Sequence, residues 1–157
     1  MLVFPPTTVY GDDPSVPPVV QPLGLAYLGA YLEQNGHEVN IIDGRGSRED
    51  ITHTPTYSRF GIPDEEILRQ VEIFDPEVLG ISNMYTAYSG DPHRIAELIK
   101  RKKPDLKIIF GGSHPSEFPE LVMKDNNVDM VVKGEGEVTF TELLDKLEKK
   151  EPLTNIL

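Results

Sequence analysis

Five short, largely apolar runs rich in β-branched residues are spaced along the chain. The apolar residues in them are continuous rather than alternating, which is typical of strands in a parallel sheet that is covered on both faces. The expected strands are Leu2–Phe4, Val39–Ile42, Val78–Ser82, Lys107–Phe110 and Asp129–Val132.

The segments between these runs carry apolar residues at helical spacing. Leu25, Leu28 and Leu32 recur at i, i+3 and i+7, which places them on one helix face. Asp91-Pro92 is expected to provide the N-cap and first residue of a later helix. The remaining helices are indicated by Ile67, Val71 and Phe74; by Ile95, Leu98 and Ile99; by Phe140, Leu143, Leu144 and Leu147; and by a shorter stretch over Pro119–Lys124.

Strand and helix therefore alternate five times along the chain. This alternation predicts an α/β fold of the Rossmann-like (flavodoxin-like) type, a doubly wound five-stranded parallel sheet in three α/β/α layers. Two connections, Pro5–Pro22 with six prolines and the irregular Gly44–Gly61, are longer than such folds need. We expect them to be functional loops, because the first leaves the sheet edge at which open parallel sheets bind ligands.

Composition narrows the possible partners and chemistry. The 157 residues include 15 Lys and Arg against 26 Asp and Glu, a formal net charge of −11 that disfavours nucleic acid and anionic membranes. Cysteine is absent, so thiol catalysis and cysteine-held iron–sulfur clusters are excluded from this chain. No apolar run reaches membrane-spanning length and no signal peptide is recognised, which predicts a cytoplasmic location.

Glycine is frequent where the expected strands end, as in Gly111-Gly112 and Gly134-Glu135-Gly136. These segments share one edge of a parallel sheet, and glycine there lets the backbone approach a ligand closely. Taken singly, each glycine could simply close a tight turn. No nucleophile–base pair or zinc-like spacing is recognised, so we assign no catalytic or metal-ligating residue.

Ser82-x-Met84 and Gly111-Gly112 resemble the Ser-x-Leu and Gly-Gly signatures of cobalamin-binding domains. Longer stretches resemble the N-terminal domains of cobalamin-dependent radical S-adenosylmethionine enzymes. They are Gln21-Pro22-Leu23-Gly24-Leu25-Ala26-Tyr27-Leu28, Gly36-His37-Glu38-Val39, Ile109-Phe110-Gly111-Gly112-Ser113-His114-Pro115 and Val131-Val132-Lys133-Gly134-Glu135-Gly136-Glu137-Val138-Thr139-Phe140.

The resemblance implies a slot beside the first helix that receives the nucleotide tail of cobalamin. Gln21 stands where the typical module has its cobalt-ligating histidine, so the resemblance implies a base-off cobalamin without a protein lower ligand. The small residues Gly24, Ala26, Gly29 and Ala30 either leave room along this helix or allow close packing. The expected cofactor-binding residues are Gln21, Leu23, Gly24, Ser82, Met84, Tyr85, Gly111, Gly112, His114, Gly134 and Glu135.

By the same resemblance, residues 1–150 form the cobalamin-binding domain and residues 151–157 begin a linker. The linker would lead to a radical S-adenosylmethionine domain that holds S-adenosylmethionine and a four-iron four-sulfur cluster. The parent protein would then be a methyltransferase or cyclase, whereas this part would not catalyse a reaction alone. The alternative is a flavin- or nucleotide-binding flavodoxin-like domain; a phosphate-receiving receiver domain is disfavoured because Ser82-Asn83 replaces its acceptor aspartate.

Overall fold

The fold is built on a five-stranded parallel sheet. A computed structural model describes residues 1–11, 21–46, 50–154 and 156. The strands lie in the order β3-β1-β6-β7-β8, with β1 Leu2–Phe4, β3 Ile41–Asp43, β6 Val78–Ser82, β7 Lys107–Gly111 and β8 Met130–Val131. Every pairing is parallel, which confirms the predicted doubly wound sheet. The strand order reverses between β1 and β6, the point at which such sheets bind ligands.

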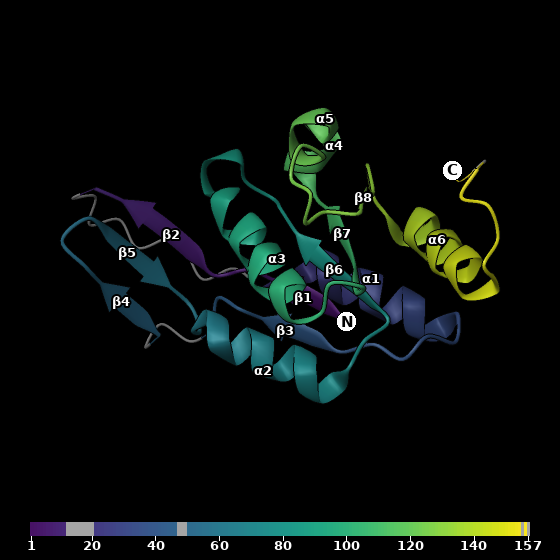
Figure 1. Cartoon of the computed structure of the whole chain (residues 1–157), viewed down its shortest axis with the longest axis horizontal. Helices are drawn as coiled ribbons and strands as arrows, with labels where there is room; N and C mark the ends of the chain where they lie inside the picture. The colour runs from purple at the N-terminus through teal and green to yellow at the C-terminus, as the bar shows by residue number, and fades with distance from the viewer. Residues whose placement is uncertain (12–20, 47–49, 155, 157) are drawn as a thin grey trace.

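Helices cover both faces of this sheet (Figure 1). On one face α2 (Asp64–Phe74) and α3 (Gly90–Lys102) pack over a core that includes Val3, Ile81 and Phe110. On the other face α1 (Leu23–Gln34) and α6 (Glu137–Lys149) pack over Leu2 and Ile109. The short helices η1 (Thr86–Tyr88), α4 (Ser113–Glu117) and α5 (Pro119–Val122) complete the described set. None of the described helices is long and apolar enough to cross a membrane.

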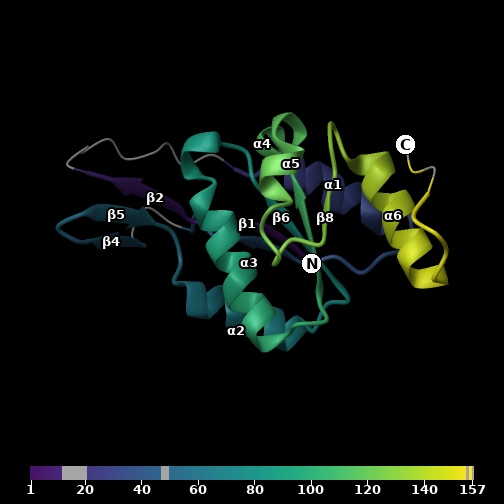
Figure 2. The same ribbon diagram turned by 45° about the horizontal axis from the view of Figure 1, so that its top comes forward.

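A second sheet occupies the two segments that the sequence predicts to be irregular. Strands β2 (Thr7–Tyr10), β4 (Ile51–His53) and β5 (Tyr57–Phe60) form an antiparallel sheet in the order β2-β5-β4. Pro5 and Pro6 separate β1 from β2, and because proline has no N–H to donate, the parallel ladder ends there. The small sheet extends from the large one on the side away from α6 (Figure 2). The expectation that these connections are irregular loops is therefore wrong for the residues of the three strands, whereas residues 12–20 and 47–49 lie outside the described part of the chain.

Charged side chains join the two sheets. The carboxylate of Asp91 on α3 accepts hydrogen bonds from the backbone N–H and the hydroxyl of Thr8 on β2, both at 2.7 Å. Arg94 lies 2.8 Å from the same carboxylate, and its Nε donates to Asp64 at 2.8 Å. Arg59 of β5 also donates to Asp64. The prediction that Asp91 is an N-cap is wrong, because Ser89 is the N-cap and Asp91 lies inside the first turn of α3. The Asp91 side chain is only 3% exposed and faces the small sheet.

Candidate functional site

A cavity of about 690 Å³ opens at the C-terminal ends of the large sheet. It lies between α1 and α6, beside the point where the strand order reverses, as ligand sites of open parallel sheets do. Its lining comes from β1, β6 and β7, from segments that follow the strands, and from the helices α1 and α6. The residues are Leu2, Phe4, Gln21, Pro22, Leu23, Gly24, Leu25, Leu28, Gly80, Ile81, Ser82, Met84, Tyr85, Ile109, Gly111, Gly112, Ser113, Ser116, Glu117, Val132, Gly134, Glu135, Gly136, Glu137 and Phe140.

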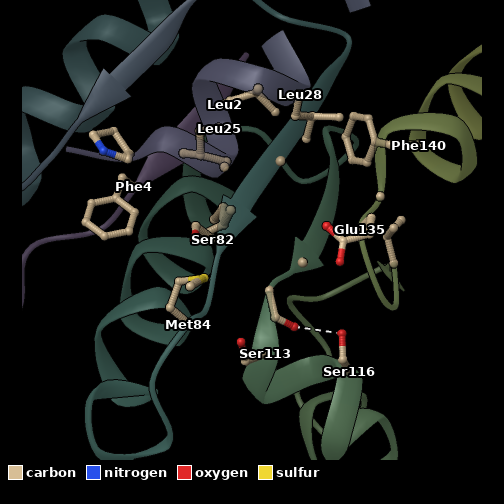
Figure 3. Close-up of a pocket in the computed structure, with 18 of the residues that line it drawn as sticks. Leu2, Phe4, Leu25, Leu28, Ser82, Met84, Ser113, Ser116, Glu135 and Phe140 are labelled. Carbon is tan, nitrogen blue, oxygen red and sulfur yellow. Dashed lines mark hydrogen bonds between the residues drawn. The ribbon is translucent and has the colours of Figure 1, made fainter. Parts of the chain in front are cut away.

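The walls of this cavity differ in polarity. Leu25 and Leu28 of α1 lie on the same side as Phe140 of α6, whereas Ser116 and Glu135 lie beyond the ends of the strands (Figure 3). The deep part is therefore apolar and the mouth carries hydroxyl and carboxylate groups. Such a cavity suits a ligand with an apolar ring at one end and a polar chain behind it.

Open space remains next to two of the cavity's glycines. A Cβ atom at Gly24 would meet no atom within 4 Å, and one at Gly111 would meet only the Val132 carbonyl oxygen at 3.9 Å. At Gly29, by contrast, a Cβ would lie 2.9 Å from Cδ1 of Ile41. The small residues of α1 therefore serve both expected purposes: Gly29 allows the helix to pack on β3, and Gly24 leaves room at the cavity.

Ser116 connects the two glycine-containing turns at the cavity mouth. Its hydroxyl donates to the Gly112 carbonyl at 2.8 Å and accepts from the Gly134 N–H at 3.0 Å; the first of these bonds is the dashed line in Figure 3. Gly112 has φ +110°, and a Cβ atom there would lie 3.0 Å from the Asn83 carbonyl oxygen. Glycine is thus needed at 112 for the backbone itself, and at 111 only for space.

Ten of the eleven expected cofactor-binding residues line this one cavity. They are Gln21, Leu23, Gly24, Ser82, Met84, Tyr85, Gly111, Gly112, Gly134 and Glu135. His114 is the exception, since it is 4% exposed and its Nδ1 lies 3.0 Å from the hydroxyl of Thr86. Burial lowers the pKa of His114, and the neighbouring His93 lowers it further. His114 therefore contacts η1 through Thr86 and is not among the residues that line the cavity.

The other three histidines also lie away from the cavity. His93 pairs with Asp125 at 2.5 Å and packs against Phe110, with ring centroids 5.0 Å apart. His37 lies 3.5 Å from Asp145, and Nδ1 of His53 lies 2.9 Å from the hydroxyl of Ser58. Within the part of the chain that the structure describes, no three His, Asp or Glu side chains are grouped to hold a metal ion.

Several lining residues were not predicted from the sequence. Phe4 and Ser116 gave no signal, because a phenylalanine at a strand end and a serine near a turn are common without any ligand. Ser113 lies within the family-like stretch Ile109–Pro115 but was not singled out. Phe140 was assigned to the apolar face of the last helix, where it does lie, but its side chain also closes the cavity. The available signal was its place at the end of the family-like stretch Val131–Phe140, which contains the glycine-rich turn at 134–136.

Most of the chain matches a known protein family and several characterised enzymes. The family model described as the B12 binding domain matches residues 14–144. The chain is 33% identical over 144 residues to the cytidylyl-2-hydroxyethylphosphonate methyltransferase of Streptomyces wedmorensis, covering 89% of this chain and 27% of that protein. It is 30% identical over 139 residues to the anaerobic magnesium-protoporphyrin IX monomethyl ester cyclase of Synechocystis sp., covering 86% and 25%.

The fold has a close counterpart among solved structures. The radical S-adenosylmethionine methyltransferase TsrM from Kitasatospora setae, solved with cobalamin and a [4Fe-4S] cluster bound, superposes with a TM-score of 0.73 at 23% identity. The match covers 99% of this chain and 25% of TsrM. This chain thus corresponds to a minor part of each of these proteins. The motif-based resemblance to cobalamin-binding domains is confirmed.

Proposed function

Because the chain belongs to the B12-binding domain family, we propose that the cavity between α1 and α6 receives the nucleotide tail of a base-off cobalamin. The observation that carries this proposal is the convergence of ten of the eleven expected cofactor-binding residues on one cavity at the switch point of the sheet. The open space beside Gly24 and Gly111 fits an inserted group, because among the described residues an added Cβ would meet nothing within 4 Å at Gly24 and only the Val132 carbonyl oxygen at Gly111.

The polarity of the walls matches the chemistry of that tail. A benzimidazole is flat and apolar, as are the side chains of Leu25, Leu28 and Phe140 in the deep part of the cavity. The ribose and phosphate that precede it are polar, as are Ser82, Ser113 and Ser116. Burial of the base would supply most of the affinity, and the hydroxyl groups would orient the chain behind it.

The absence of histidine from the cavity supports the proposal that no histidine of this chain ligates the cobalt. The chain has four histidines, and none of them is among the lining residues. Gln21 lines the cavity, and its amide is a poor substitute for an imidazole as a cobalt ligand. The cobalt would then have no nitrogen from this protein beneath it, and with the benzimidazole in the cavity it would have none from the tail either.

We assign the chain a carrier role inside a larger enzyme. Bound cobalamin supplies a cobalt centre that can accept and donate a methyl group. The residues of this chain hold the tail and exclude water from the cavity. The relatives are methyltransferases and a cyclase of which this chain spans 27% and 25%, so a linked radical S-adenosylmethionine domain would complete the enzyme. With no cysteine, this chain leaves the iron–sulfur cluster to that domain.

The proposal is tested by titrating the chain with hydroxocobalamin. We expect the visible spectrum to change to that of the base-off form as the protein is added, with a matching heat of binding in calorimetry. Folded protein that gives neither signal at micromolar concentrations contradicts the proposal. Flavin mononucleotide is the comparison ligand, because binding of the flavin alone favours the flavin-binding alternative.

Electron paramagnetic resonance of the bound Co(II) form separately tests whether a nitrogen atom ligates the cobalt. An axial nitrogen splits each cobalt line into a triplet through its nuclear spin, whereas oxygen or no ligand leaves single lines. We expect single lines. Triplets would mean that a histidine moves to the metal or that the benzimidazole stays coordinated, and the His-off assignment would then be wrong.

A further inference from the structure

A second cavity lies on the same face of the large sheet as the first, between α1 and α6. Its volume is about 680 Å³, and it opens at the N-terminal ends of the strands, where Met1, Val78 and Lys107 lie. The proposed cofactor cavity opens at the opposite ends of these strands. Both are bounded by α1 or the turn after it on one side and by α6 on the other. The space between these helices is thus hollow at both ends.

Two side chains separate the cavities. Leu2 and Phe140 are the residues that line both of them. Leu2 pairs with Gly80 in the sheet register, and a Cβ at Gly80 would lie 2.7 Å from Cδ2 of Leu2 and 3.2 Å from Cζ of Phe140. The two side chains therefore meet over the middle of the sheet, where the missing side chain of Gly80 makes room for them. Figure 3 shows Phe140 extending from α6 towards Leu28 of α1.

The space beyond this partition is apolar on its inner side. Leu32, Val39, Leu144 and Leu147 line the second cavity and belong to the same apolar cluster as Leu2 and Phe140. Phe140 is 5% exposed and Leu2 2%. An apolar group that extended past Leu2 and Phe140 would thus enter an apolar environment. These two side chains, and not the polarity of the second cavity, therefore limit how far a ligand can extend.

From this geometry we infer that Phe140 is a specificity-determining residue, which sets the depth of the cofactor cavity and thereby the size of the lower base that a corrinoid can carry into it. The inference rests on the proposed function, since it assumes that the base enters this cavity. A base of benzimidazole size stops against the ring of Phe140. A base extended by another fused ring meets the ring of Phe140 and binds more weakly.

The test compares two corrinoids that differ only in the lower base. One is cobalamin, and the other carries a naphthimidazole, which is longer by one fused ring. For the unchanged protein we expect cobalamin to bind more tightly by about tenfold or more, since hydrophobic pockets discriminate by this much against a misfitting group. For Phe140→Ala the ratio of the two dissociation constants should approach one, because the second cavity becomes available. Calorimetry measures both constants.

A matched control is provided by Leu143→Ala. Leu143 lies on the same helix and is 4% exposed, but it lines neither cavity. The variant should lose stability as Phe140→Ala does and keep the original ratio. If Phe140→Ala does not fold, Phe140→Leu replaces it, and the ratio should then fall part of the way towards one.

The possible outcomes separate the two claims. An unchanged ratio in a folded Phe140 variant overturns the role of Phe140 while the proposed function stands. The same holds if the unchanged protein binds both corrinoids equally. If neither corrinoid binds the unchanged protein or any variant, the proposed function fails and this inference fails with it.

Discussion

The hydroxyl of Ser116 donates a hydrogen bond to the main-chain carbonyl of Gly112 at 2.8 Å. The same oxygen accepts the N–H of Gly134 at 3.0 Å, so one small side chain links the turn after β7 to the turn after β8. Both turns line the cavity. Ser116 therefore fixes the spacing of two segments that the sequence places 22 residues apart.

Removing this link should loosen the cavity mouth. We expect Ser116→Ala to lower the free energy of unfolding by about 1–2 kcal/mol, the worth of two ordinary hydrogen bonds, and to weaken hydroxocobalamin binding. The Gly134 amide should exchange its hydrogen faster in the ligand-free variant. Ser116→Thr keeps the hydroxyl and should restore both properties. An unchanged exchange rate at Gly134 would show that the link has no such role.

Filling the slot at Gly111 should block binding without damage to the fold. A Cβ there meets only the Val132 carbonyl oxygen at 3.9 Å, so Gly111→Val should retain the unfolding transition of the parent chain. The added branches occupy cavity space, and the affinity for hydroxocobalamin should fall by at least about tenfold. Unchanged affinity in a folded variant would place the tail elsewhere.

Gly112→Val should behave differently, although the Gly111-Gly112 motif in the sequence does not distinguish the two glycines. At φ +110° a branched side chain is strained, and its Cβ would lie 3.0 Å from the Asn83 carbonyl oxygen. We expect a loss of roughly 1–3 kcal/mol in stability before any ligand is added. Thermal unfolding of the two variants side by side measures the difference. Equal stabilities would contradict this reading of the turn.

Asp91→Ala should detach the small sheet from the core. The substitution removes the acceptor of both Thr8 hydrogen bonds and a carboxylate beside Arg94. Loss of one partner of a buried ion pair costs about 3–5 kcal/mol, which urea unfolding can measure. Glu97→Ala on the same helix removes an exposed carboxylate and should change stability by less than about 0.5 kcal/mol. Similar losses in both variants would rule out a special role for Asp91.

Stability should fall in mild acid because of His114. Burial holds its pKa below the usual value in the folded state, so the unfolded chain binds the proton more readily. This contribution to stability is complete above the unfolded pKa of about 6.5 and is lost as the pH falls below it. Urea unfolding between about pH 7 and pH 5 should therefore show a decline that is smaller in His114→Gln. Parallel declines in the two proteins would assign the effect to other groups.

The large sheet was predictable because its strands are buried on both faces and therefore read as continuous apolar runs. Val78–Ser82 was predicted with the bounds that the structure gives, and Val39–Ile42 was displaced by two residues at its start. The motif residues at the strand ends were predictable for a related reason: parallel topology brings the C-terminal ends of strands to one edge, however far apart they lie in sequence.

The small sheet was not predictable in the same way. Tyr57–Phe60 contains Ser58 and Arg59, and Ile51–His53 is only three residues long. Such strands show no apolar run, since one of their stabilising contacts is the ion pair of Arg59 with Asp64 on a different element. The role of Phe140 was hidden for a similar reason, because an apolar residue at helical spacing looks the same whether it fills a core or closes a cavity.

Pro5 and Pro6 make the two sheets separate hydrogen-bonded units, joined through side chains such as Thr8 and Asp91. Proteins open in cooperative pieces, and a piece held by few buried apolar contacts opens at a lower free energy than the whole. Amides of β5 should thus exchange through a local opening of the small sheet, whereas those of β6 and β7 should exchange only when the entire chain unfolds.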